Sequence, residues 1–244
     1  MRLIRVHVDA ALAPGARVTL GGAATAHLRR VLRLESGDAV TLFNGDGADY
    51  PSRIAEFGRG AAEAEVTDRV AARAESPLSI TLVQGIARTE RMDLVVQKAT
   101  ELGVVAIVPV ATTRGVVRLD AATRTRKRAH WQGIAVAACE QCGRARVPDV
   151  TEPRPLEAFL AEPPPGGARL LLSPDAQVSL AAIAQGAASI ALLIGPEGGL
   201  EESERLAAIA AGWRPCRLGP RVLRSETAAI AALAVLQSVA GDLG

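Results

Sequence analysis

Residues 192–200, LLIGPEGGL, decide the fold that this sequence predicts. An apolar run typical of a buried strand ends at Ile194, and the turn GPEGG (195–199) follows it directly. A charged segment of helix-forming residues then begins at Glu201. This order of a strand, a glycine turn and a helix N-terminus predicts a turn whose backbone can approach a small polar ligand closely.

A second stretch, LGPRVLRSETA (218–228), follows about twenty residues later. A third apolar run ends in the same way at Leu172-Ser173-Pro174. Ligands of open α/β sheets bind beyond the carboxyl ends of the strands. Each turn alone is typical of an ordinary strand–helix connection, but the three together, with Glu197 and Arg224 inside them, favour one shared site. The spacing matches neither GxGxxG nor a Walker loop, so the glycines do not identify the ligand.

The apolar pattern divides the chain into residues 1–72 and 76–244. The first part predicts a small, mostly β barrel with a hairpin at NGDG (44–47). Its predicted strands are residues 3–8, 17–20, 39–43, 50–57 and 62–70, with a helix at 25–32. The second part alternates strands and helices, which indicates a parallel sheet covered on both faces. Its predicted strands are 78–86, 104–110, 169–172, 190–194 and 214–218, and its predicted helices are 93–102, 123–142, 156–160, 202–211 and 227–239.

The composition limits the class of protein. No run of eighteen apolar residues occurs and the N-terminus has no signal-peptide core, so we expect a cytoplasmic protein without a membrane span. Three cysteines give no disulfide framework. The CxxC at 139–142 lies in a predicted helix and lacks a second ligand pair, so we expect no metal there and a cysteine that packs against the sheet.

Positive charge is concentrated in one part of a nearly neutral chain. Residues 71–130 carry ten basic and five acidic side chains, whereas the whole chain has a net charge of +2. The excess centres on Arg114, Arg118 and residues 124–128. A cluster of this kind is typical either of a surface that binds a polyanion or of a solvated helix face.

The two signature stretches resemble those of the SPOUT class of S-adenosylmethionine-dependent RNA methyltransferases. Within that class the chain is similar to the bacterial 16S ribosomal RNA uracil-1498 N3-methyltransferases. Further segments carry this resemblance: HLRRVLRLESGDAVTLFNGDG (27–47), RMDLVVQKATELGV (91–104), TTR (112–114) and HWQGIAVAACEQCGRARVP (130–148). Ser225 stands where threonine is more usual, and Gly133 where lysine is common.

The resemblance implies an N-terminal PUA-like RNA-binding β-barrel and a C-terminal α/β domain with a deep trefoil knot formed by residues 192–227. It also implies a homodimer with the site near the interface and S-adenosylmethionine as a bent cofactor. The cofactor-binding residues that it implies are Leu172, Ser173, Ile194, Gly195, Pro196, Glu197, Gly198, Gly199, Leu218, Gly219, Val222, Leu223, Arg224, Ser225, Glu226, Thr227 and Ala228.

The implied reaction methylates N3 of one uridine in 16S rRNA of the small subunit. It needs a group that takes the N3 proton or stabilises the uracil anion. The candidates are Arg224 for the anion and Glu226 or Glu197 for the proton. Each glutamate also has a structural alternative: Glu197 as an acceptor of backbone N–H bonds and Glu226 as an acid in the first turn of a helix.

The resemblance also implies contacts with RNA. The predicted RNA contacts are Arg2 or Arg5, Arg29, Arg30, Arg33, Arg114, Arg118, Arg124, Arg126 and Arg128. The alternatives are a non-catalytic RNA-binding factor of ribosome assembly and an enzyme of the same fold that methylates another RNA target, such as a ribose 2′-hydroxyl.

Overall fold

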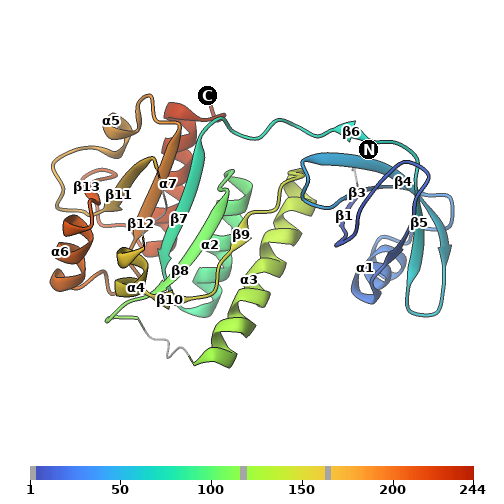
Figure 1. The fold of residues 1–244 in the computed structure, drawn as a ribbon, viewed down its shortest axis with the longest axis horizontal. Helices are drawn as coiled ribbons and strands as arrows, with labels where there is room; N and C mark the ends of the chain where they lie inside the picture. The colour runs from blue at the N-terminus through green and yellow to red at the C-terminus, as the bar shows by residue number, and fades with distance from the viewer. Residues whose placement is uncertain (1–3, 116–119, 163–165) are drawn as a thin grey trace. The chain divides into compact units, whose positions relative to one another are not determined.

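The computed structural model describes residues 4–115, 120–162 and 166–244. The chain forms two compact units, Met1–Glu75 with Cys139–Val147 and Ser76–Ala138 with Pro148–Gly244. Figure 1 shows the order of the elements in both units. A division of the sequence at residues 72–76 does not anticipate that residues 139–147 group with the first unit.

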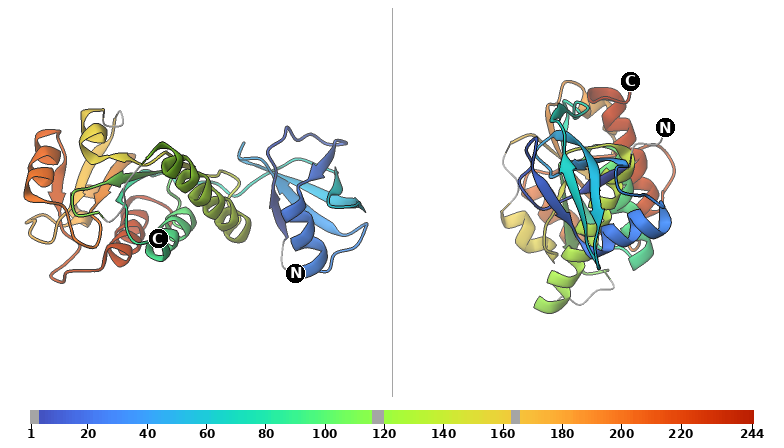
Figure 2. Two further views of the ribbon diagram at one scale, coloured as in Figure 1. Left: turned by 90° about the horizontal axis from the view of Figure 1, so that it is seen from below. Right: turned by 90° about the vertical axis from the view of Figure 1, so that its right-hand side faces the viewer.

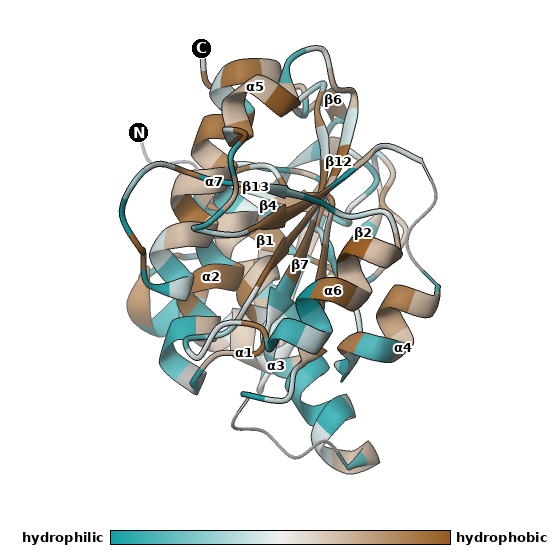
Figure 3. Ribbon diagram, turned by 90° about the vertical axis from the view of Figure 1, so that its left-hand side faces the viewer, coloured by the Kyte–Doolittle hydropathy of each residue, from teal (hydrophilic) through white to brown (hydrophobic). Residues whose placement is uncertain are grey.

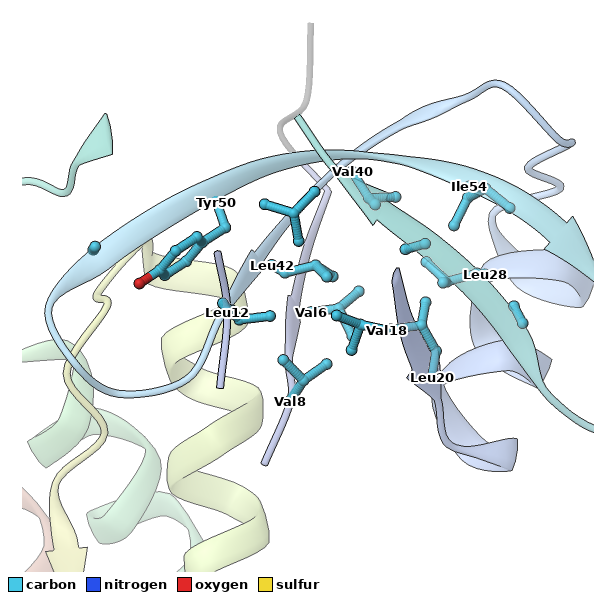
Figure 4. Close-up of a cluster of buried hydrophobic side chains, with 14 residues drawn as sticks. Val6, Val8, Leu12, Val18, Leu20, Leu28, Val40, Leu42, Tyr50 and Ile54 are labelled. Carbon is cyan, nitrogen blue, oxygen red and sulfur yellow. The ribbon is translucent and has the colours of Figure 1, made fainter. Parts of the chain in front are cut away.

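The first unit is built on a curled sheet of six strands. Its elements are β1 (Arg5–His7), β2 (Arg17–Leu20), α1 (Gly22–Ala26), the π-helical turn η1 (His27–Val31), β3 (Ala39–Phe43), β4 (Ala48–Phe57), β5 (Ala62–Val66) and β6 (Val70–Ala71). The strand order is β1-β3-β4-β5-β2, and β6 pairs with β4. In Figure 4 the buried side chains of Val6, Leu20, Leu42 and Ile54 gather on the inner side of the sheet. Burial of these apolar side chains holds the unit together.

The turn between β3 and β4 has the predicted hairpin form. Gly45 and Gly47 have φ angles of 91° and 88°, which favour glycine. The carboxylate of Asp46 accepts hydrogen bonds from the backbone N–H of Ala48 at 2.8 Å and from the Tyr50 hydroxyl at 2.6 Å. The hairpin prediction is therefore confirmed, and the predicted helix at 25–32 corresponds to α1 and η1.

Residues 139–147 complete the first unit. Cys139 and Ala145 form a buried cluster with Phe43 of β3. The carboxylate of Glu140 accepts a hydrogen bond from the backbone N–H of His7 at 3.0 Å, and Arg144 forms an ion pair with Glu75 at 2.7 Å. Burial raises the pKa of the Cys139 thiol to about 12, which leaves it protonated and unreactive at neutral pH. A cysteine of the CxxC is buried as predicted, but it packs against Phe43 of the first unit's sheet.

The second unit is a parallel α/β sheet, as predicted. Its strands are β7 (Ser79–Gly85), β8 (Ala106–Ala111), β9 (Asp149–Val150), β10 (Arg154–Pro155), β11 (Ala168–Leu172), β12 (Ser189–Ile194) and β13 (Arg214–Cys216). The order is β10-β8-β7-β12-β11-β13, with β9 beside β8, and each of these pairings is parallel. The helices are α2 (Thr89–Glu101), α3 (Ala121–Cys142), α4 (Leu156–Ala161), α5 (Leu180–Ala184), α6 (Glu202–Ala210) and α7 (Ser225–Ala240).

Helices cover both faces of this sheet (Figure 2). One face packs against α4 and α6 through a core that includes Phe159 and Trp213. The other face carries α7, which contacts α2 and α5. The helix α6 begins with charged and polar residues, whereas further along its exposed surface it carries Leu206 and Ile209 (Figure 3). Among the described residues no helix is long and apolar enough to cross a membrane.

The order of the strands brings the predicted turns together. β12, β11 and β13 are consecutive neighbours. β12 and β11 end at the start of two of the turns, and β13 ends at Cys216, two residues before the third. Because the strands are parallel, their carboxyl ends lie at the same edge of the sheet. The trefoil knot of residues 192–227 stays a prediction.

Candidate functional site

A cavity of about 640 Å³ lies at this edge of the sheet, within the second unit. Its wall contains fifteen of the residues predicted to bind a cofactor. They are Leu172, Ser173, Ile194, Gly195, Pro196, Glu197, Gly198, Gly199, Leu218, Gly219, Val222, Leu223, Arg224, Ser225 and Ala228. Glu226 and Thr227 do not line it. The structure thus brings the two signature stretches and the end of β11 to one place.

Glycines allow the backbone to pass closely around the cavity. A Cβ atom on Gly85, at the end of β7, would lie 2.5 Å from the backbone nitrogen of Pro196. A Cβ atom on Gly195 would lie 3.1 Å from the backbone nitrogen of Leu200. Gly199 and Gly219 have φ angles of 69° and 131°, which residues with a side chain rarely adopt. The loop after β12 therefore needs its glycines for shape.

Ser225 ties the two signature stretches to each other. Its hydroxyl donates a hydrogen bond to the carbonyl of Gly195 at 2.7 Å and accepts one from the Gln84 amide at 3.0 Å. Gln84 is completely buried, and its Nε2 also donates to the carbonyl of Gly85 at 3.0 Å. This chain of hydrogen bonds joins β7, the loop after β12 and the first turn of α7.

Glu197 is held by the N-terminal end of α2. Its Oε1 accepts hydrogen bonds from the backbone N–H of Arg88 at 3.0 Å and from Nη1 of Arg91 at 3.3 Å. Burial raises the pKa of Glu197, but backbone N–H bonds from Arg88 and Glu197 and the charges of Arg91 and Arg88 outweigh it, so the pKa is lowered. A carboxylate with a lowered pKa is a weaker base, and these contacts favour the structural role.

Glu226 lies in the first turn of α7 with only 13% of its side chain exposed. Its Oε1 is 3.7 Å from Nε of Arg91. Its Oε2 is buried and has no hydrogen-bond partner among the described residues. Glu226 is therefore less tightly held than Glu197.

Arg224 is the residue that precedes α7. Its backbone is extended, with φ −62° and ψ 150°, and its side chain is exposed on the cavity wall. Within the described part of the chain, no acidic side chain forms an ion pair with it. Its guanidinium is available to a ligand.

The predicted RNA contacts of the first unit differ in their exposure to solvent. Arg29, Arg30 and Arg33 are exposed on or just after η1. Arg5 is only 7% exposed, forms an ion pair with Asp49 at 2.7 Å and donates to the carbonyl of Arg144 at 3.0 Å. The structure therefore does not favour Arg5 as an RNA contact, because its guanidinium is already paired inside the unit. Arg2 lies outside the described residues.

The arginines of the second unit are also unequal. Nη1 of Arg114 donates to the carbonyl of Gly198 at 3.1 Å, so it supports the glycine loop. Arg126 is exposed on α3, whereas Arg124 is partly buried. Arg128 donates to the carbonyl of Val150 at 3.0 Å and lies 3.5 Å from Asp149. Arg118 lies outside the described residues.

Sequence reasoning missed eight residues of the cavity wall. They are Arg91, Leu171, Pro174, Asp175, Leu200, Glu202, Arg205 and Arg221. Arg91 comes from α2, about a hundred residues before the first signature stretch. In the sequence, the one signal that pointed to it was its position at the start of the segment 91–104, which resembles the family. Glu202 and Arg205 form an ion pair one turn apart on α6, which is also a common surface arrangement.

Comparison with known proteins agrees with this architecture. Residues 74–237 match the family of RNA methyltransferase domains, and residues 20–67 match the RNA methyltransferase PUA domain. Ribosomal RNA small subunit methyltransferase E of Buchnera aphidicola subsp. Schizaphis graminum is 31% identical, covering 99% of this chain and 98% of its own. The Mycobacterium tuberculosis protein of the same name is 32% identical, covering 93% and 88% of the two chains.

Two solved structures match over the full length of both chains. One is a Legionella pneumophila protein in complex with bound SAM, with a TM-score of 0.94 and 38% identity. The other is ribosomal RNA small subunit methyltransferase E from Neisseria gonorrhoeae bound to S-adenosyl methionine, with a TM-score of 0.92 and 36% identity. The chain belongs to the RNA methyltransferase family and, within it, to the ribosomal RNA small subunit methyltransferases E.

Proposed function

We propose that this protein transfers a methyl group from S-adenosylmethionine to N3 of uridine 1498 in 16S rRNA of the small ribosomal subunit. One observation carries the proposal: both signature stretches of the family line a single cavity at the carboxyl edge of a parallel sheet. The relatives named as small-subunit rRNA methyltransferases span nearly the whole chain. The reaction then takes place in the cytoplasm, where small subunits are assembled.

The cavity wall has groups that fit each part of the cofactor. Apolar side chains of Leu172, Ile194 and Leu218 offer a surface for the adenine ring. Asp175 offers a carboxylate for hydroxyl or ammonium groups, and Arg224 a cation for a carboxylate or an anion. When bound, S-adenosylmethionine supplies an electrophilic methyl group, so the chain itself needs to orient the uracil and manage one proton.

The N3–H of uracil is a poor nucleophile until its proton is lost. In our proposal Arg224 stabilises the negative charge that develops on a uracil oxygen, because its guanidinium is exposed at the cavity and has no ion-pair partner in the described part of the chain. Glu226, which lies outside the cavity wall but directly follows Arg224 and Ser225 on it, is the proton acceptor that we propose, since Glu197 is held by two donors and has a lowered pKa. Full turnover of Glu226→Gln with normal cofactor affinity would remove Glu226 from this role.

The RNA is bound mainly through its phosphates. The exposed Arg29, Arg30 and Arg33 of the first unit and Arg126 of α3 are the contacts that we propose. Arg114, Arg124 and Arg128 are secondary candidates, since Arg114 and Arg128 already bond to backbone carbonyls and Arg124 is partly buried.

A homodimer with a knotted cofactor site is part of the same proposal. Val222 lines the cavity and is 81% exposed in the single chain, which supports its being covered by a second copy or by ligand.

Methyl transfer to small subunits that lack the modification tests the proposal. Labelled S-adenosylmethionine is supplied, and the product nucleoside is identified by mass spectrometry. The expected product is 3-methyluridine at one position. A 2′-O-methylated nucleoside would keep the cofactor site and overturn the target, and the absence of both transfer and cofactor binding would identify a non-catalytic RNA-binding factor.

A further inference from the structure

Arg91 occupies a special place at the cavity. It lies in the first turns of α2, lines the cavity and keeps 34% of its side chain exposed. Nη1 is 3.3 Å from Oε1 of Glu197, and Nε is 3.7 Å from Oε1 of Glu226. One guanidinium therefore spans the loop after β12 and the first turn of α7, which carry the two signature stretches.

The two glutamates depend on Arg91 to different degrees. Glu197 also accepts a hydrogen bond from the backbone N–H of Arg88, so it keeps a donor when the Arg91 side chain is removed. For Glu226, Arg91 is the single cationic partner among the described residues, and the other carboxylate oxygen has no partner there. A largely buried carboxylate without a cation is costly, so loss of Arg91 acts chiefly on Glu226.

We propose that Arg91 is a positioning residue for methyl transfer, which acts through Glu226 and fixes the start of α7 against the loop after β12. The inference rests on the proposed function, because it assigns Arg91 to that reaction. In-line transfer depends strongly on the placement of the reacting groups, and small displacements cost large factors in rate. A guanidinium suits this role, because its rigid fork contacts two carboxylates at once.

The test measures kcat, cofactor dissociation constant and Tm for the full-length Arg91→Gln variant. We expect kcat to fall by roughly 10- to 100-fold, with a much smaller change in cofactor affinity. Arg91→Lys keeps the charge but lacks the fork, so it should recover only part of kcat. The matched control is Lys98→Gln, which breaks an ion pair of 2.8 Å with Glu101 on the same helix, outside the cavity wall. A kcat for Arg91→Gln equal to that of Lys98→Gln would overturn the proposal.

A double-mutant cycle with Glu226→Gln separates positioning from a general loss of structure. If Arg91 acts through Glu226, then Arg91→Gln has little further effect on kcat in the Glu226→Gln background. Fully additive losses would overturn the inference. The proposed function fails separately: unmodified subunits would then receive no methyl group from the wild-type protein, whatever the variants do.

Discussion

At the scale of single residues, the charged side chains at or next to the cavity differ in whether they already have hydrogen-bond or ion-pair partners. Glu197 is tied to two donors, and Glu226 has one long ion pair. Arg224 is exposed at the cavity without an acidic partner in the described part of the chain. Free charges at a ligand site are available for chemistry, whereas paired charges hold the walls in place.

Arg224→Ala should therefore reduce turnover far more than cofactor binding. The expected loss in kcat is about 10²-fold, which is typical of removing one group that stabilises a developing anion. The measurement compares single-turnover methyl transfer with cofactor affinity from calorimetry. Unchanged turnover would remove Arg224 from the mechanism.

Glu197 should make the stability of the protein depend on acid pH. Its pKa in the folded protein is lowered from the ordinary value of 4.5, so its contribution is present above 4.5 and is lost as the pH falls through the lowered value. The difference in the free energy of unfolding between the wild type and Glu197→Gln should shrink over this acid range. Urea denaturation at several pH values measures it, and a constant difference would contradict the assignment.

At the scale of elements, the end of β7 and the loop after β12 fit together without spare room. Gly85→Ala would place a methyl group 2.5 Å from backbone and ring atoms of Pro196, so we expect loss of stability and of cofactor binding. Gly133→Ala in α3 is the matched control, because its Cβ meets nothing within 4 Å. It should raise the stability by about 0.4–1 kcal/mol. Thermal unfolding and cofactor titration of both variants check this pair of expectations.

Elements with a strong local pattern were predictable from the sequence. The bounds of β2 and β3 agree with prediction, because alternating or continuous apolar residues and clear turns mark them. The strands β9 and β10 have two residues each and the helix α5 has five, which is too short for a periodic signal. These elements are set by pairing with β8 and by packing on α7, which only the folded chain reveals.

The candidate site was predictable where glycines and neighbouring strands mark it. Fifteen predicted residues line the cavity because β11, β12 and β13 end side by side. Arg91 was missed because its partners Glu197 and Glu226 are more than a hundred residues away. The pairing of Arg5 with Asp49 was likewise not visible in the sequence, because the two residues lie on different strands.

At the scale of the whole molecule, RNA binding should depend strongly on salt. Each arginine that contacts a phosphate releases bound counterions, so affinity for small-subunit RNA falls as the salt concentration rises. Arg30→Ala should weaken binding and reduce the slope of log affinity against log salt by about 1. Arg5→Lys, which alters a buried guanidinium, should leave this slope unchanged. Binding that is insensitive to salt would contradict the phosphate contacts.

The discontinuous makeup of the first unit has a consequence for how the protein is made. Its core around Phe43 includes Cys139 and Ala145, which leave the ribosome about seventy residues after Glu75. At roughly 5–20 residues per second, the nascent N-terminal sheet waits for several seconds with that part of its core open. The first unit can therefore complete its core only after residues 139–147, which lie well inside the catalytic part of the sequence, have been translated.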